Sequence, residues 1–150
     1  MRISPRRLAA PTILLPLLLS LILSACSSGS VDSQPTIKLY PLDKLPSDVQ
    51  SAPATVQQAY QFAVANPEIM TQIPCYCGCG AMGHTSNYAC YVSAGQSDGS
   101  VVYDAHALGC SICVDITLDT MRLTKEGETV QQIKTYIDET YSPYGPSNMP

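Results

Sequence analysis

The sequence is poor in positive charge. Its 150 residues contain eight Lys and Arg against twelve Asp and Glu, and three of the basic residues, Arg2, Arg6 and Arg7, lie at the N-terminus. Downstream of residue 25, five basic and twelve acidic residues remain, which is a net charge of −7. Nucleic-acid binding and polybasic contacts with membranes need clustered Lys and Arg, so this deficit argues against both. It suits a domain that meets cationic partners or metal ions.

The chain also lacks the residue patterns of common hydrolases and nucleotide-binding enzymes. No Ser/His/Asp set, no carboxylate pair and no glycine-rich phosphate loop is present in the sequence, although these chemistries depend on such groups. Aromatic and basic residues show no clustering. The pattern favours a binding protein over an enzyme.

Cysteine and histidine, in contrast, are concentrated in one part of the chain. Six of the seven cysteines and both histidines lie between residues 75 and 113. The run Pro74-Cys75-Tyr76-Cys77-Gly78-Cys79-Gly80 has a thiol at every second position, so an extended chain would place all three sulfurs on one face. Thiolates select soft metal centres such as Cu(I), zinc and iron–sulfur clusters. The candidate ligands are Cys75, Cys77, Cys79, His84, Cys90, His106, Cys110 and Cys113.

The pair Cys110 and Cys113 forms a CxxC sequence at the start of a predicted helix. A helix N-terminus favours a thiolate and lowers its pKa, which suits either a ligand pair or a redox pair. A redox pair is usually found near a βαβ pattern, and the sequence shows none. If residues 106–113 were helical, His106 would share a face with both cysteines.

Disulfide bonds are the main alternative to a metal site. The six cysteines could form three bridges in an oxidising compartment. The cysteines alone therefore support disulfide bonds and a metal site almost equally. The two histidines favour metal, with copper expected and zinc as the alternative, for metal storage or delivery. Two other functions stay open: a thiol–disulfide oxidoreductase that uses Cys110 and Cys113, and a disulfide-stapled module that binds another envelope protein.

The N-terminal segment 1–25 reads as a secretory leader. It has a basic start, an apolar run from Leu8 to Leu23, and small residues before Cys26, the layout of a cleavable signal peptide. The sequence Leu23-Ser24-Ala25-Cys26 resembles the bacterial lipobox, which implies cleavage before Cys26 and acylation there, with palmitate among the acyl chains. The protein would then be lipid-anchored on the extracytoplasmic face of the cell membrane, where it meets a metal-receiving or redox envelope protein. A retained signal anchor is disfavoured because Pro11 and Pro16 interrupt the short apolar run.

The remaining chain divides into three parts. Residues 26–52 are rich in Ser, Gly and Pro and predict a flexible linker, and residues 142–150 predict a loose tail. Residues 53–141 predict one small, mainly α domain of about four helices that enclose a long Cys/His-rich loop, with one or two short strands. The expected helices cover residues 53–65, 67–72, 110–126 and 129–141; Gly127 is expected to end the third, and Thr129 to cap the fourth.

The Cys-rich motif is the most specific feature of the sequence. Residues 74–80, the pair Gly83-His84, Cys90 and the Cys110/Cys113 pair together resemble the PCYCGC-motif proteins, a family of bacterial lipoproteins and secreted proteins. The resemblance covers about half of the chain after the leader. It implies a lipoprotein with a Cys-rich motif and does not identify a reaction.

Overall fold

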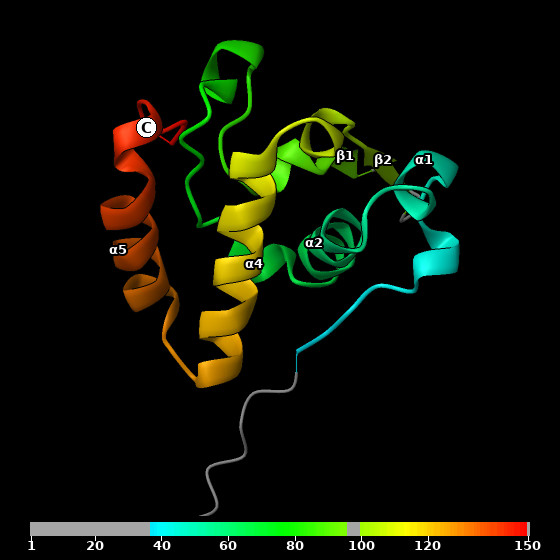
Figure 1. Ribbon diagram of the computed structural model, residues 1–150, viewed down its shortest axis with the longest axis horizontal. Helices are drawn as coiled ribbons and strands as arrows, with labels where there is room; N and C mark the ends of the chain where they lie inside the picture. The colour runs from blue at the N-terminus through cyan, green and yellow to red at the C-terminus, as the bar shows by residue number, and fades with distance from the viewer. Residues whose placement is uncertain (1–36, 96–99, 150) are drawn as a thin grey trace, which may run out of the picture. The chain divides into compact units, whose positions relative to one another are not determined.

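Apolar side chains recur at helical spacing in three long segments, and each segment is a helix in the computed structural model (Figure 1). The structure describes residues 37–95 and 100–149. The leader 1–25, Cys26 and residues 27–36 lie outside the described residues. The α-helices of the described part are α1 Ser47–Gln50, α2 Ala54–Ala65, α3 Pro67–Met70, α4 Ser111–Glu126 and α5 Val130–Tyr141.

Helix α2 buries one face, on which apolar residues recur at helical spacing in the sequence. Val56, Ala59, Tyr60 and Ala63 are all buried, and Phe62 joins them with no exposed surface. Burying an aromatic side chain of this size stabilises the fold by about 2–3 kcal/mol. This helix packs against α4, which contacts α5 on its other side. Helix α4 is thus the central element of the domain (Figure 1).

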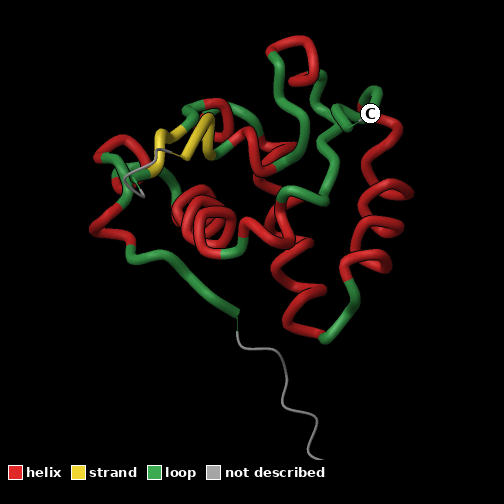
Figure 2. Tube along the Cα trace, turned by 180° about the vertical axis from the view of Figure 1, so that it is seen from behind, coloured by secondary structure: helices red, strands yellow, loops and turns green. Residues whose placement is uncertain are grey.

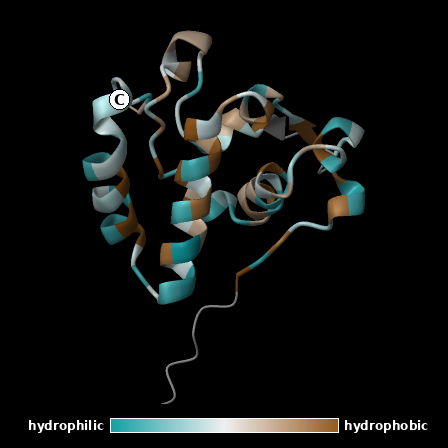
Figure 3. Cartoon of the chain, viewed as in Figure 1, coloured by the Kyte–Doolittle hydropathy of each residue, from teal (hydrophilic) through white to brown (hydrophobic). Residues whose placement is uncertain are grey.

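Helices α4 and α5 form a hairpin whose turn follows the predicted signals. Gly127 ends α4 with φ of 89°, a left-handed conformation that glycine adopts without a Cβ clash. Thr129 then caps α5, and its hydroxyl and Gln132 form a capping box. Ile133 and Ile137 are buried. Figure 3 shows the hydrophobic residues of α5 on the side that faces α4.

The folded part begins earlier than the sequence predicts. The predicted flexible linker extends to residue 52, but residues 37–52 contain a 3-10 turn, η1 Leu42–Lys44, followed by α1. Leu45 and Val49 are 3% and 2% exposed, and α1 contacts α2. The prolines that suggested a linker stand at element starts instead, because Pro46 precedes α1 and Pro53 precedes α2. The linker prediction is therefore wrong for residues 37–52.

The rest of the described chain is a short sheet and a long irregular segment. Strands β1 Val92–Gly95 and β2 Val101–Tyr103 pair antiparallel, with Val92 opposite Tyr103. The prediction of a mainly helical single domain with a Cys/His-rich region and one or two short strands is confirmed. Between α3 and β1 the chain forms loops and 3-10 turns (Figure 2). Among the described residues, no helix has the length and apolar character needed to cross a bilayer.

Candidate metal centre

The three cysteines of the motif lie on a turn rather than on a strand. Residues 74–78 belong to no helix or strand, and Gly78 has φ of 83°, which glycine tolerates. The chain bends there into a 3-10 helix, η2 Cys79–Met82. The Sγ atoms of Cys75 and Cys77 lie 3.4 Å apart, and all three sulfurs lie within 4.8 Å of one another. The predicted gathering of sulfurs is present, but a turn produces it.

Two further predicted ligands, His84 and Cys90, lie beside Cys79. The backbone N–H of His84 donates to the carbonyl of Cys79 at 3.3 Å. This hydrogen bond holds the chain that follows η2 beside the motif. Cys90 ends the 3-10 helix η3 Tyr88–Cys90, and its Sγ lies 3.7 Å from that of Cys79. All three side chains are buried.

A buried hydrogen-bond network holds this loop against the first turn of α4. The Tyr91 hydroxyl donates to the carbonyl of Cys113 at 2.9 Å and accepts from Thr117 at 2.7 Å. The Asn87 amide donates to the Thr117 hydroxyl at 2.8 Å. These groups are fully buried, and their paired atoms stabilise the contact, while Asn87 Oδ1 makes no hydrogen bond. The network sets the position of Cys113 relative to the loop that carries Cys90.

The remaining candidates come from the segment that leads into α4. His106 opens a 3-10 helix, η4 His106–Leu108, and Gly109 separates this turn from α4. Cys110 is the N-cap residue of α4, and Cys113 lies in its first turn. Residues 106–113 are thus not one helix, yet the ligand atoms of His106, Cys110, Cys113 and Cys77 lie within 4.8 Å of one another.

All eight predicted residues lie in one continuous cluster. One set of four contains Cys77, His106, Cys110 and Cys113, and another contains Cys79, His84, Cys90 and His106. Cys75 connects the two sets. Its sulfur lies within 4.8 Å of the sulfurs of four other cysteines, which are Cys77, Cys79, Cys90 and Cys113. Their role as ligands is a proposal, and Cys26 lies outside the described residues.

The spacing of the sulfurs fits metal ligands better than disulfides. Contacts of 3.4–3.7 Å join Cys75 to Cys77 and to Cys113, and Cys79 to Cys90. A tetrahedral ion with metal–sulfur bonds of 2.3 Å would separate its sulfurs by about 3.8 Å, whereas a disulfide needs about 2.05 Å. All six cysteines of the described chain are free thiols. The cluster can therefore hold a metal ion.

The electrostatics of the cluster concentrate negative charge on one sulfur. Hydrogen bonds from the thiols of Cys113 and Cys90 lower the pKa of Cys75 to about 2. Burial, and then the charge of Cys75, raises the pKa of Cys77 and of Cys79. Hydrogen bonding to Cys75 raises the pKa of Cys113. A hydrogen bond with Cys113 lowers the pKa of Cys90, but the bond to Cys75, burial and the nearby charges together raise it above its ordinary value.

His84 has one ring nitrogen paired and one without a partner. Its Nε2 lies 3.5 Å from a carboxylate oxygen of Asp104, while Nδ1 is buried and makes no hydrogen bond in the structure. The edge of one imidazole meets the face of the other, with the centroids of His84 and His106 5.1 Å apart. A histidine that ligates a metal commonly contacts a carboxylate through its other nitrogen. The arrangement of His84 matches this pattern.

Two groups next to the cluster, Asp104 and Asn148, are not predicted from the sequence. Asp104 also accepts from the backbone N–H of His106 at 2.8 Å. Burial raises the pKa of its carboxyl, but hydrogen bonds from His106, Ser93 and His84 outweigh burial and hold the pKa below its ordinary value. The only sequence signal for Asp104 was its place two residues before a histidine.

Asn148 lies in the segment expected to be a loose tail. Its side-chain oxygen accepts from the backbone N–H of Cys75 at 2.7 Å, and its backbone N–H donates to the carbonyl of Cys75 at 3.0 Å. Its amide donates to the Sγ of Cys79 at 3.4 Å. Figures 1 and 2 show the C-terminal segment beside the loop that carries the motif. The tail prediction is wrong here, because Asn148 pairs with the backbone of the motif.

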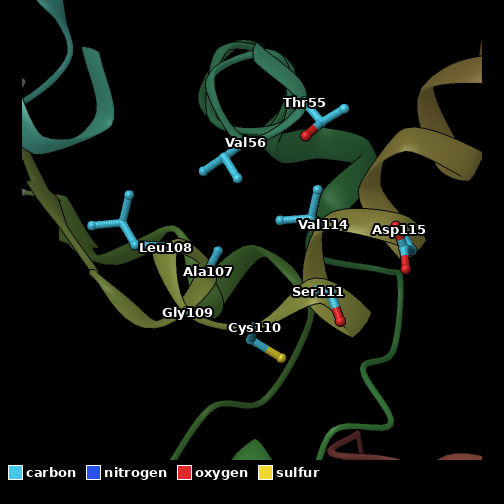
Figure 4. A pocket seen from close by; sticks show the side chains of 9 residues that line it. All are labelled: Thr55, Val56, Ala107, Leu108, Gly109, Cys110, Ser111, Val114 and Asp115. Atoms are coloured by element: carbon cyan, nitrogen blue, oxygen red, sulfur yellow. The ribbon is translucent and has the colours of Figure 1, made fainter. Parts of the chain in front are cut away.

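A pocket next to the cluster shares Cys110 with it. It has a volume of about 310 Å³, and its lining includes Val56, Leu108, Cys110 and Val114. Figure 4 shows the sulfur of Cys110 directed away from the apolar side chains of Val56 and Val114. Thr55, Ser111 and Asp115 add polar side chains to the lining.

Comparison with known proteins identifies one family. A family model described as "Protein of unknown function with PCYCGC motif" matches residues 15–150. No curated protein and no solved structure matches the chain.

Proposed function

The chain belongs to the family of proteins with the PCYCGC motif, and we propose that it binds a soft transition metal for storage or delivery outside the cytoplasm. One observation carries the proposal. The buried Nδ1 of His84 has no partner, and His84 groups with the ligand atoms of Cys79, Cys90 and His106. A buried polar atom without a hydrogen bond costs roughly 1–3 kcal/mol, and a metal ion would offset that cost.

Copper in its cuprous state is the first candidate for the metal. Six thiols and two imidazoles surround the site, so sulfur predominates. Thiolates favour soft ions such as Cu(I), and Zn(II) is the alternative because it is readily bound by cysteine and histidine together. The fully deprotonated cluster would carry more negative charge than one ion can balance, which favours binding of cations in general.

The exposure of the cluster suits a protein that receives and releases metal. Cys77, His106 and Cys110 are half-buried, whereas the other five candidate ligands are buried. A partner with its own thiols or imidazoles could approach the half-buried ligands and exchange the ion with them. The proposed partner is therefore a metal-receiving envelope protein.

The location follows from the leader. We propose that Cys26 carries the lipid anchor and that the domain stands on the extracytoplasmic face of the bacterial cell membrane. The support is the lipobox-like sequence at residues 23–26, since two or more acyl chains make anchorage stable.

A thiol–disulfide oxidoreductase is the second candidate function. Cys110 is half-exposed at the N-cap of α4, and Cys113 lies buried in the first turn, an order that suits a nucleophilic and a resolving thiol. A redox enzyme must cycle this pair, so Cys113→Ser would trap a mixed disulfide with its partner. A metal protein would show no such adduct.

One preparation tests these functions together. The full chain is expressed with its leader and purified in detergent under anaerobic conditions, and its metals and free thiols are counted. We expect the unmodified protein to contain Cu(I) or, alternatively, Zn(II). The triple variant Cys75/Cys77/Cys79→Ser should lose most of this bound metal. Three disulfides and no metal, even after reduction and addition of Cu(I) or Zn(II), would support the disulfide-stapled module instead.

A further inference from the structure

We propose that the cluster binds two metal ions in adjoining sites, an inner ion that the protein retains and an outer ion that it exchanges. This inference rests on the proposed function and adds the number of ions and the role of each. A closed zinc site has four ligands, and eight candidate ligands form overlapping groups here. One ion cannot use them all.

The ligands divide into two sets of three cysteines and one histidine. His106 belongs to both sets of four, but a neutral imidazole has one free nitrogen lone pair and binds one ion. Its Nε2 lies 3.4 Å from the sulfur of Cys77, which assigns it to the site with Cys77. We call this the outer site. Its ligands are Cys77, His106, Cys110 and Cys113.

Cys75 lies between the outer site and the other set, which we call the inner site. Its sulfur lies within 4.8 Å of the sulfurs of Cys79 and of Cys90. It also lies 3.4 Å from the sulfur of Cys77 and 3.5 Å from that of Cys113, both in the outer site, so the two sites adjoin at this residue and its thiolate bridges them. The inner site consists of Cys79, His84 and Cys90 together with the bridging Cys75, and all eight candidate ligands are then used.

The two sites differ in their access to solvent. All four ligands of the inner site are buried, whereas only Cys113 of the outer site is. Exchange of a fully buried ion requires local opening of the structure, while half-exposed ligands can be replaced one at a time from outside. The inner ion should therefore leave more slowly.

Groups around the cluster also orient the ligands of the inner site. Asp104 contacts the imidazole of His84, and Asn148 donates to the sulfur of Cys79 and bonds the backbone of Cys75. Such contacts orient ligands and raise metal affinity. In the outer site, Cys110 stands at the half-exposed N-cap of α4.

The test uses the full chain in detergent, loaded anaerobically with Cu(I) and, in parallel, with Zn(II), then desalted. We expect two Zn(II) ions per chain, because zinc takes four ligands in each site. A strong chelator should remove them in two phases of equal amplitude, with the second phase slower by roughly tenfold or more because it requires local opening.

Two variants assign the phases. Cys110→Ser should keep one ion and lose the fast phase, while His84→Ala should keep one ion and lose the slow phase. Met82→Ala serves as the matched control, because Met82 lies in η2 between the ligands and is 62% exposed. It should keep two ions and both phases.

The outcomes separate this inference from the proposed function. One ion per chain, with one of the two variants unaffected and the other unable to bind, would mean a single site and would overturn the two-ion inference alone. No ion with either metal would overturn the proposed function itself. If His84→Ala fails to fold, the number of ions bound by the unmodified chain and its two release phases still test whether there are two sites.

Discussion

Asp104 contacts both halves of the cluster without being one of its candidate ligands. It lies 3.5 Å from His84 Nε2 and accepts from the backbone of His106. We expect Asp104→Asn to weaken metal binding by about 10- to 100-fold, because the amide keeps the shape but loses the charge that orients the His84 ring. Competition with a chelator of known affinity measures this.

The matched control is Asp43→Asn, since Asp43 is exposed in η1. The metal affinity of the Asp43→Asn variant should equal that of the unmodified chain. Equal affinities in all three proteins would mean that Asp104 serves the fold and not the metal.

The thiols of the cluster make metal binding dependent on pH. Hydrogen bonding and burial raise the pKa values of Cys77, Cys79, Cys90 and Cys113, so these thiols hold their protons at neutral pH, whereas the pKa of Cys75 is lowered. A metal ion must displace such protons, so affinity should fall as the pH falls. We expect at least two protons released per ion, because each proposed site contains two thiols with raised pKa values. Calorimetry in buffers of different ionisation enthalpy counts them, and a release of no protons would contradict the electrostatic description.

At the scale of secondary-structure elements, Tyr76 connects the motif to α5. Its hydroxyl donates to Asp138 Oδ1 at 2.7 Å. Loss of this bond in Tyr76→Phe should lower the free energy of unfolding by about 1 kcal/mol. Urea denaturation measures the difference, and Tyr144→Phe is the control because Tyr144 is 65% exposed.

The same bond predicts a dependence on alkaline pH. Burial and the Asp138 carboxylate raise the pKa of Tyr76 to about 12. Because the folded pKa is above the unfolded one, the contribution is complete below about pH 10 and is lost as the pH rises toward 12. The difference between Tyr76→Phe and the unmodified chain should therefore vanish at high pH. A difference that is constant up to pH 12 would contradict this assignment.

For the whole molecule, metal should stabilise the domain because its ligands come from separate elements. Cys79 starts η2, Cys90 ends η3, His106 opens η4 and Cys113 lies in α4. A metal at a free concentration a hundredfold above its Kd would add about 2.7 kcal/mol to the free energy of unfolding. Thermal melts with Cu(I), with Zn(II) and with a chelator measure this, and an unchanged Tm would contradict binding at these ligands.

The anchor is also tested on the whole molecule. We expect Cys26→Ala to abolish lipid labelling and to leave an unprocessed or released protein, because no other residue can take the acyl groups at the lipobox. Ser27→Ala, which changes the neighbouring residue, should keep the label. Normal processing and membrane retention of Cys26→Ala would exclude the lipid anchor.

Local signals were sufficient for the long helices and for the inventory of candidate ligands. Spacing placed Val56 and Tyr60 on the buried face of α2, and Gly127 and Thr129 ended and began helices where expected. These features depend on residues a few positions apart, so a single sequence contains them. The same holds for the concentration of thiols and imidazoles in residues 75–113.

Contacts between distant residues were decided by the tertiary structure alone. Asn148 bonds Cys75 across 73 positions, and Val49 is buried near α2, although composition suggested loose chain at both places. The turn at Gly78 and the packing of the loop against α4 set which sulfurs meet. Sequence spacing cannot show this, because a ligand set depends on where separate segments pack and not on their order in the chain.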